Sequence, residues 1–195
     1  MGDGLSGPWD LPPFPDHGDT NADLTYAAVG RAMSEWEEVE LYLARLYAAF
    51  LGIPPIEAIA RPEYTRVAVA RERSRVIEEV AHAYFVRHPD QTLESEFETL
   101  ICDARNFAAR RNDIAHGVVK LAWGQFDDSM LGAALARKEV MLLPGTYMFK
   151  KFDDKRMPAY MLSSVEINRF AEHFRAFRFE RIEPLIIRIA RRLLP

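Results

Sequence analysis

The chain has 195 residues, of which 49% are hydrophobic and 28% are charged. This length and composition indicate one globular domain, or at most two small ones, with a sizeable core. Cys102 is the only cysteine, which excludes an intrachain disulfide and a cysteine-based zinc site. No apolar run is long enough to predict a membrane span, and the first residues lack the pattern of a secretory signal. We therefore expect a cytoplasmic protein without a membrane partner.

The formal net charge of −4 is unevenly distributed. Residues 1–23 hold five aspartates and neither lysine nor arginine, so this segment carries −5 and the remainder carries +1. A nearly neutral body excludes a protein that coats nucleic acid through its overall charge. A local site for phosphate remains compatible with this distribution.

Residues 1–20 contain four glycines and four prolines and show no helical period. This composition predicts an irregular N-terminal arm, followed by one helical domain over residues 21–195. One interpretation is a loose tail, whose deletion leaves the melting temperature nearly unchanged. The other is an arm that Trp9, Leu11 and Phe14 pin into a groove.

Apolar residues at a spacing of three and four predict long amphipathic helices after this arm. The first begins at Asn21 or Asp23, which are good N-cap residues, and ends at Gly52. A short helical turn follows over 56–60, and two further long helices are expected over 63–86 and 92–116. Gly117 stands where a C-cap glycine is expected.

The segment 118–162 loses the helical period and contains the turn pair Pro144-Gly145. It predicts a short helix over 126–137 and hairpin strands near 138–143, 146–152 and 158–162. The last long helix begins at Ser163, which forms a capping box with Glu166, and Pro184 kinks or restarts it. The predicted fold is all-α: an antiparallel four- to five-helix bundle with a small β-hairpin insert between helices three and four.

The run from Arg110 to Gly117, RRNDIAHG, gathers guanidinium, amide and imidazole groups at the end of the third predicted helix. Asn112 and His116 are four residues apart, so they share a helix face. Basic residues are also favoured at helix C-termini by the macrodipole. A histidine that only caps the helix is therefore an alternative interpretation.

Arg111-Asn112-x-x-x-His116 resembles the R-x4–6-H motif of the HEPN (higher eukaryotes and prokaryotes nucleotide-binding) superfamily. The resemblance implies a small helical bundle that is commonly a dimer. It also implies a metal-independent endoribonuclease, of which several are toxins with an antitoxin partner, or a protein that only binds RNA or nucleotide. The residues carried over are Arg111, Asn112 and His116. Arg110 gives a second register, with five intervening residues instead of four.

The same residues suit RNA cleavage by the 2′-hydroxyl. The reaction needs one proton removed and one donated, for which histidine has a suitable pKa, and a positive charge on the transition state, which arginine supplies. One copy supplies one such histidine, so a two-fold dimer with the motif at its interface is expected. No Walker loop, His-Glu-x-x-His or Rossmann glycine pattern is present, so neither a metal nor a cofactor is expected for this reaction. The nearby cations assigned to nucleic-acid binding are Arg105, Arg110 and Lys120.

Two other functions stay open. One is a non-catalytic helical dimerisation or interaction module, and an apolar stripe formed by Leu24, Tyr42 and Tyr47 on the first helix favours self-association. The other is a di-metal carboxylate bundle. Its ligands would be Glu79 and His82, Asp113 and His116, Glu35 or Glu38, and Glu172.

Overall fold

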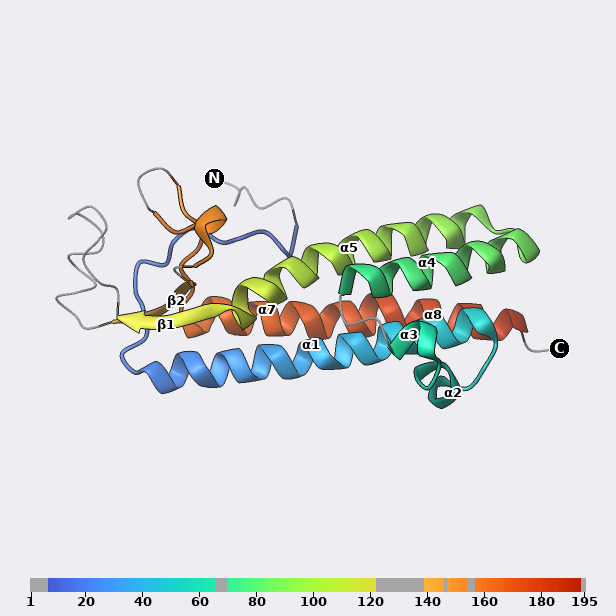
Figure 1. The fold of residues 1–195 in the computed structure, drawn as a ribbon, viewed down its shortest axis with the longest axis horizontal. Helices are drawn as coiled ribbons and strands as arrows, with labels where there is room; N and C mark the ends of the chain where they lie inside the picture. Colours follow the sequence, from blue (N-terminus) through green and yellow to red (C-terminus); the bar gives the residue numbers. More distant parts are fainter. Residues whose placement is uncertain (1–6, 66–69, 122–138, 146, 154–156, 194–195) are drawn as a thin grey trace. The chain divides into compact units, whose positions relative to one another are not determined.

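The computed structural model describes residues 7–65, 70–121, 139–145, 147–153 and 157–193. This described part is mostly helical and contains a small two-stranded antiparallel sheet (Figure 1). The chain forms two compact units. Unit 1 comprises Met1–Glu35 and Ala109–His173, and unit 2 comprises Trp36–Ala108 and Phe174–Pro195. None of the described helices is long and apolar enough to cross a bilayer.

The first long helix, α1, covers Ala22–Leu51 and confirms the predicted ends. Its start is capped by Asn21, whose Oδ1 accepts a hydrogen bond of 2.9 Å from the Asp23 amide. Gly52 follows the last turn with φ of 66°, a left-handed conformation that glycine adopts without steric cost. Both ends are therefore fixed by residues next to them in the sequence.

Shorter helices precede the next long pair. They are α2 (Pro55–Ile59) and α3 (Pro62–Thr65), and the long pair is α4 (Ala70–Arg87) and α5 (Gln91–Ala115). The predicted helix over 63–86 corresponds to α3 and α4 with residues 66–69 outside the described part, whereas the prediction over 92–116 matches α5. The helices of the described residues are thus more numerous than the four or five predicted.

The C-terminal stretch is one helical run with a change of winding. α7 covers Ser164–Phe177, a π-helical segment η2 covers Arg178–Ile182, and α8 covers Glu183–Leu193. The capping box is confirmed, because the Ser163 amide donates to Glu166 Oε2 at 2.7 Å. Pro184 lies in the first turn of α8, as expected of a proline that restarts a helix.

The sheet lies in unit 1. β1 (Gly117–Leu121) pairs with β2 (Val140–Pro144), with Gly117 opposite Pro144 and Leu121 opposite Val140. Bridges from Asp19 to Val140 and from Leu162 to Leu142 hold β2 to further segments of this unit. β2 is buried along its whole length. It therefore forms the centre of this part of unit 1.

The hairpin prediction is partly wrong. The expected strand near 138–143 corresponds to β2, but residues 146–152 include a 3-10 helix, η1 (Phe149–Lys151), instead of a strand. The segment 158–162 makes only isolated bridges, at Pro158 and Leu162. β1 was not expected, because Gly117 suggested a helix cap. The predicted helix over 126–137 lies outside the described residues.

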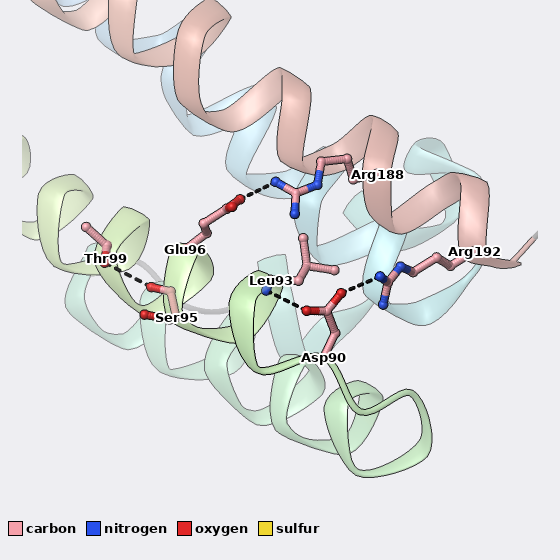
Figure 2. A network of polar contacts seen from close by, with 7 residues as sticks. All are labelled: Asp90, Leu93, Ser95, Glu96, Thr99, Arg188 and Arg192. Atoms are coloured by element: carbon pink, nitrogen blue, oxygen red, sulfur yellow. Dashed lines mark hydrogen bonds and ion pairs between the residues drawn. The ribbon is translucent and has the colours of Figure 1, made fainter.

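Charged pairs join α5 and α8 within unit 2 (Figure 2). Arg188 pairs with Glu96, and Arg192 with Asp90, where the two arginines are one helical turn apart. Asp90 also caps α5 by accepting a hydrogen bond of 2.9 Å from the Leu93 amide. This bond is the main cause that lowers the pKa of Asp90, and Arg192 lowers it further. The Asp90 carboxylate thus caps α5 and also forms an ion pair with Arg192 of α8.

The apolar stripe expected to favour a dimer is not a continuous exposed surface. Leu24 is exposed, but Tyr47 is buried and stacks on Tyr64 with ring centroids 4.9 Å apart. Tyr42 is only half-buried, and the guanidinium carbons of Arg45 and Arg178 lie 4.6 and 5.5 Å from its ring centroid. The stripe therefore gives no support to self-association.

The N-terminal arm is attached to unit 1 through Asp19, whose exposure is 7%. Its Oδ2 accepts hydrogen bonds from the Ser164 amide at 2.9 Å and from the Thr25 hydroxyl, and its Oδ1 accepts one from the Ser164 hydroxyl at 2.6 Å. A carboxylate at this place satisfies the first amide of α7 and complements the helix dipole. Phe14 packs against the cluster of Met141, Leu143 and Met161.

These contacts contradict the interpretation of residues 1–20 as a loose tail. We expect Asp19→Ala to lower the free energy of unfolding by about 1–3 kcal/mol, because it leaves the α7 start and two hydroxyls without their acceptor. Thermal unfolding followed by circular dichroism measures this loss. Asp16→Ala, at an exposed position of the same arm, is the matched control. Equal melting temperatures for the two variants would contradict the anchoring role of Asp19.

Candidate functional site

The motif lies at the C-terminal end of α5, where the helix passes almost directly into β1. The His116 amide closes the last turn by donating to the Asn112 carbonyl at 3.0 Å. The next carbonyl, that of Asp113, accepts a hydrogen bond of 2.8 Å from the Tyr160 hydroxyl. The last carbonyls of a helix lack partners within the helix, so the phenol supplies one of the missing donors. The helix end is thereby fixed to the segment that follows the hairpin.

Asp113 is the centre of an ion-pair cluster. Its side chain is 2% exposed, with Arg110 Nη2 2.9 Å from Oδ2 and Lys151 Nζ 2.8 Å from Oδ1. Arg110 lies one turn earlier on α5, and Lys151 belongs to η1. A buried carboxylate requires such partners, because an unpaired charge in this place costs several kcal/mol. The cluster therefore fixes the direction of the Arg110 side chain.

The three residues that carry the family resemblance lie beside this cluster. Arg111 is half-buried and donates from Nη1 to Asn112 Oδ1 at 3.1 Å, so it orients the amide next to it. His116 is exposed, and within the described part of the chain its imidazole has no hydrogen bond or ion pair. The capping interpretation of His116 thus finds no acceptor among these residues. The imidazole is open to a ligand.

Gly117 has a different role from the one expected. It starts β1, and among the described glycines only Gly52 has a positive φ. A Cβ at Gly117 would lie 2.6 Å from Leu142 Cγ on the paired strand, so any larger residue would push β2 away. Glycine is required here by the close approach of two strands instead of by a helix cap.

The other predicted nucleic-acid contacts divide between the two units. Arg105 belongs to unit 2, where its Nη2 pairs with Glu78 Oε2 at 2.6 Å. Lys120 belongs to unit 1 and is exposed on β1, opposite Met141. Arg105 is thus engaged by a carboxylate of its own unit, whereas Lys120 extends the exposed charge along the strand that follows His116.

Two further residues of this region were not expected from the sequence. Tyr147 is 67% exposed, and Lys150 is also exposed. Both belong to the short segment after Pro144, the residue paired with Gly117. The only signal for them was the interpretation of 146–152 as a strand, which is wrong. The Met148 amide donates to the Gly145 carbonyl at 2.8 Å, so the chain turns directly after β2.

The pKa of Tyr160 depends on its burial and on the neighbouring Asp113, Arg110 and Tyr147. Burial is the main cause that raises the pKa of the Tyr160 phenol, and the Asp113 carboxylate raises it further, while Arg110 opposes this. Tyr147 adds a smaller upward contribution to this pKa. The Tyr160 phenol therefore stays protonated and continues to donate to the Asp113 carbonyl across the neutral pH range.

The di-metal arrangement does not form among the described residues. Within them, no group of three or more histidine, cysteine, aspartate or glutamate side chains is placed to hold a metal ion. Asp113 is engaged by two cations, and Glu79 pairs with Arg75 at 3.3 Å. The geometry thus leaves these two proposed ligands committed to basic side chains.

Comparison of the chain with family models, with curated proteins and with solved structures gives no match. The chemistry of the site is therefore argued from its own residues. They offer a proton-transfer group in His116, an amide in Asn112, the cations Arg110 and Lys151 on the buried Asp113 carboxylate, and further cations at Arg111 and Lys150. These groups suit a negatively charged ligand. A phosphate diester fits this description, because a guanidinium can donate two parallel hydrogen bonds to its two non-bridging oxygens.

Loss of the Asp113 charge tests the cluster. We expect Asp113→Asn to lower the free energy of unfolding by about 1–3 kcal/mol, because Arg110 and Lys151 lose their shared partner while partly buried. Tyr160→Phe removes one hydrogen bond to a buried carbonyl and costs about 1 kcal/mol. Urea unfolding with linear extrapolation measures both. Glu172→Gln, at an exposed site of the same unit, serves as control, and an Asp113→Asn value equal to this control would refute the cluster.

Proposed function

We propose that this protein is a HEPN-like RNA-binding protein and a metal-independent endoribonuclease that acts through Arg111 and His116. The observation that carries the proposal is the exposed imidazole of His116, held at a rigid junction between α5 and β1 beside the cations around Asp113. This arrangement places a group able to transfer protons next to groups able to hold a phosphate. The proposal includes an antiparallel helical bundle as the fold and the cytoplasm as the place of action.

Each residue receives a separate role. His116 transfers a proton to or from the reacting oxygens, because an imidazole has one nitrogen that can accept a proton and one that can donate it. Arg111 holds two non-bridging oxygens of the scissile phosphate and stabilises the charge that develops on them. Asn112 orients the Arg111 guanidinium, to which it is already hydrogen-bonded. No redox change occurs, and the 2′-oxygen replaces the 5′-oxygen on phosphorus.

The ion pair of Asp113 supports one of the two motif registers. Arg110 forms a short ion pair with this buried carboxylate, so we assign it the role of holding the helix end. Arg111 is then the motif arginine of the proposal. We expect Arg110 to contribute less to nucleic-acid binding than the exposed Lys120 and Lys150.

The proposed chemistry needs both a proton acceptor and a proton donor, whereas one chain supplies His116 once. A two-fold dimer that places two copies of the motif together supplies the pair. We therefore propose a homodimer with His116 at its interface. An antitoxin that covers the exposed imidazole is the kind of partner that would restrain such an enzyme.

The cleavage test uses purified protein and RNAs of mixed sequence, analysed on gels. We expect cleavage that persists in EDTA, products that end in cyclic phosphate, and no cleavage of DNA, which lacks the nucleophile. His116→Ala should lower the rate by about 10²–10⁴-fold. Arg111→Lys should also lose activity, since a point charge does not replace the planar fork.

Arg110→Lys is the matched control, because lysine retains the ion pair with Asp113 and should retain most of the activity. If Arg110→Lys lost more cleavage activity than Arg111→Lys, the catalytic role would belong to Arg110. Cleavage that requires a metal and is lost in Glu79→Ala would support the di-metal bundle instead. If the protein neither cleaved nor bound RNA, the remaining candidate function would be that of a helical interaction module.

The dimer has its own test in light scattering coupled to gel filtration. At tens of micromolar protein, we expect a mass twice that of one chain. His116→Glu should shift the distribution towards the monomer, because two negative charges would meet at the two-fold axis. Tyr26→Glu, which makes the same charge change at another exposed site of unit 1, is the control. A monomeric mass for the wild-type chain at this concentration would refute the shared site.

A further inference from the structure

An exposed aromatic ring belongs to the segment that follows β2, whose last residue pairs with the residue after the proposed catalytic histidine. Tyr147 is 67% exposed, although tyrosine normally buries much of its ring. Its ring lies over Gly145: a Cβ added there would be 2.6 Å from Tyr147 Cε1 and 3.2 Å from Cζ. The glycine therefore permits the ring to fold back onto the chain, and most of the ring surface remains open to solvent.

The strand register places this ring beside the motif. Gly117 and Pro144 are the last pair of the antiparallel ladder, so His116 and Gly145 are the residues directly beyond this pair, at the same end of the sheet. Tyr147 covers Gly145, and its phenol also contributes to the electrostatic surroundings of Tyr160, which donates to the Asp113 carbonyl. The ring, the imidazole and the Asp113 cluster thus belong to one end of unit 1.

The charge at this end has the sign that a nucleic-acid backbone requires. Arg110 and Lys151 pair with the Asp113 carboxylate at 2.9 and 2.8 Å, and Arg111 and Lys150 are their neighbours in the sequence. Lys150 is exposed and is three residues from Tyr147. An open aromatic face with cations on either side is the combination by which proteins hold single strands, with bases stacked on the ring and phosphates on the cations.

We propose that Tyr147 is the base-stacking residue of the site, so that an unpaired base next to the scissile phosphate lies on the Tyr147 ring. The inference rests on the proposed function and adds a positioning residue to it. A duplex keeps its bases stacked on one another and offers none to the ring. The ring therefore selects unpaired segments and sets the distance between the base and His116.

The experiment measures binding separately from cleavage. In the His116→Ala background, fluorescence anisotropy gives the Kd for a labelled single-stranded RNA of twelve nucleotides and for the same sequence as a duplex. We expect Tyr147→Ala to weaken single-strand binding by about 5- to 150-fold, the range for loss of one base stack. Tyr147→Phe should bind like the parent, because the ring and not the hydroxyl makes the contact. Duplex binding should be unaffected by either change.

Tyr26→Ala is the matched control, since Tyr26 is 58% exposed on α1 of the same unit. A series of RNAs with one abasic site moved along the strand identifies the stacked base. At one position the abasic site should weaken binding to the parent and have no added effect in Tyr147→Ala. That pattern in a protein without cleavage activity would support the stacking site while the proposed reaction fails.

Two results would overturn the inference. One is equal single-strand affinity for Tyr147→Ala and Tyr26→Ala in a protein whose parent cleaves RNA, which would leave the reaction intact and remove the ring from it. The other is equal weakening of single-strand and duplex binding by Tyr147→Ala, which would indicate a general effect on the fold or the backbone contacts. Circular dichroism of both variants distinguishes these two causes.

Discussion

The charge of one buried carboxylate holds the candidate site together. Asp113 lies near the end of α5 with almost no exposure, and two cations from different elements share it. The cost of burying this charge forces Arg110 and Lys151 to meet it, and so brings η1 to the end of α5. Tyr160 adds a hydrogen bond to the carbonyl of the same residue. Side chain and backbone of Asp113 thus connect three segments around the motif.

This arrangement divides the basic residues by their role. Arginines next to each other in the sequence have different surroundings: Arg110 is compensated by Asp113, and Arg111 is directed along the helix towards Asn112. His116 is exposed while its neighbours are held. A proton-transfer group needs contact with its substrate, whereas the groups that position it need fixed partners. The two requirements are met by residues only a few positions apart.

The sequence predicted those features that depend on nearby residues. Asn21, Gly52 and the pair Ser163 and Glu166 fix helix ends through contacts within a few positions, so their patterns were sufficient. Gly117 was misinterpreted because the reason for glycine is Leu142 on β2, and the local pattern did not indicate that this predicted strand pairs with the residues after His116.

At the site itself, the surroundings of Asp113 and Tyr147 also depend on distant residues and could not be predicted from the local pattern. Asp113 was considered as a metal ligand, since its spacing to His116 says nothing of Lys151 approaching from η1. Tyr147 could not be identified from the sequence, because a single aromatic residue in a short turn has no pattern of its own. Its relation to the motif depends on the pairing of Gly117 with Pro144. The motif was identifiable from six consecutive residues, whereas its surroundings depend on contacts between distant segments.

The junction at His116 has a consequence for the speed of any reaction there. α5 ends at Ala115 and β1 begins at Gly117, so a single residue separates a helix from a strand. The backbone hydrogen bond to Asn112 holds it on one side and the pairing of Gly117 with Pro144 on the other. The main chain at the imidazole has lost its freedom during folding, and this entropy is not lost again when a ligand arrives. Preorganisation of this kind lets the side chain alone rotate, on a picosecond to nanosecond timescale, while its anchor stays still.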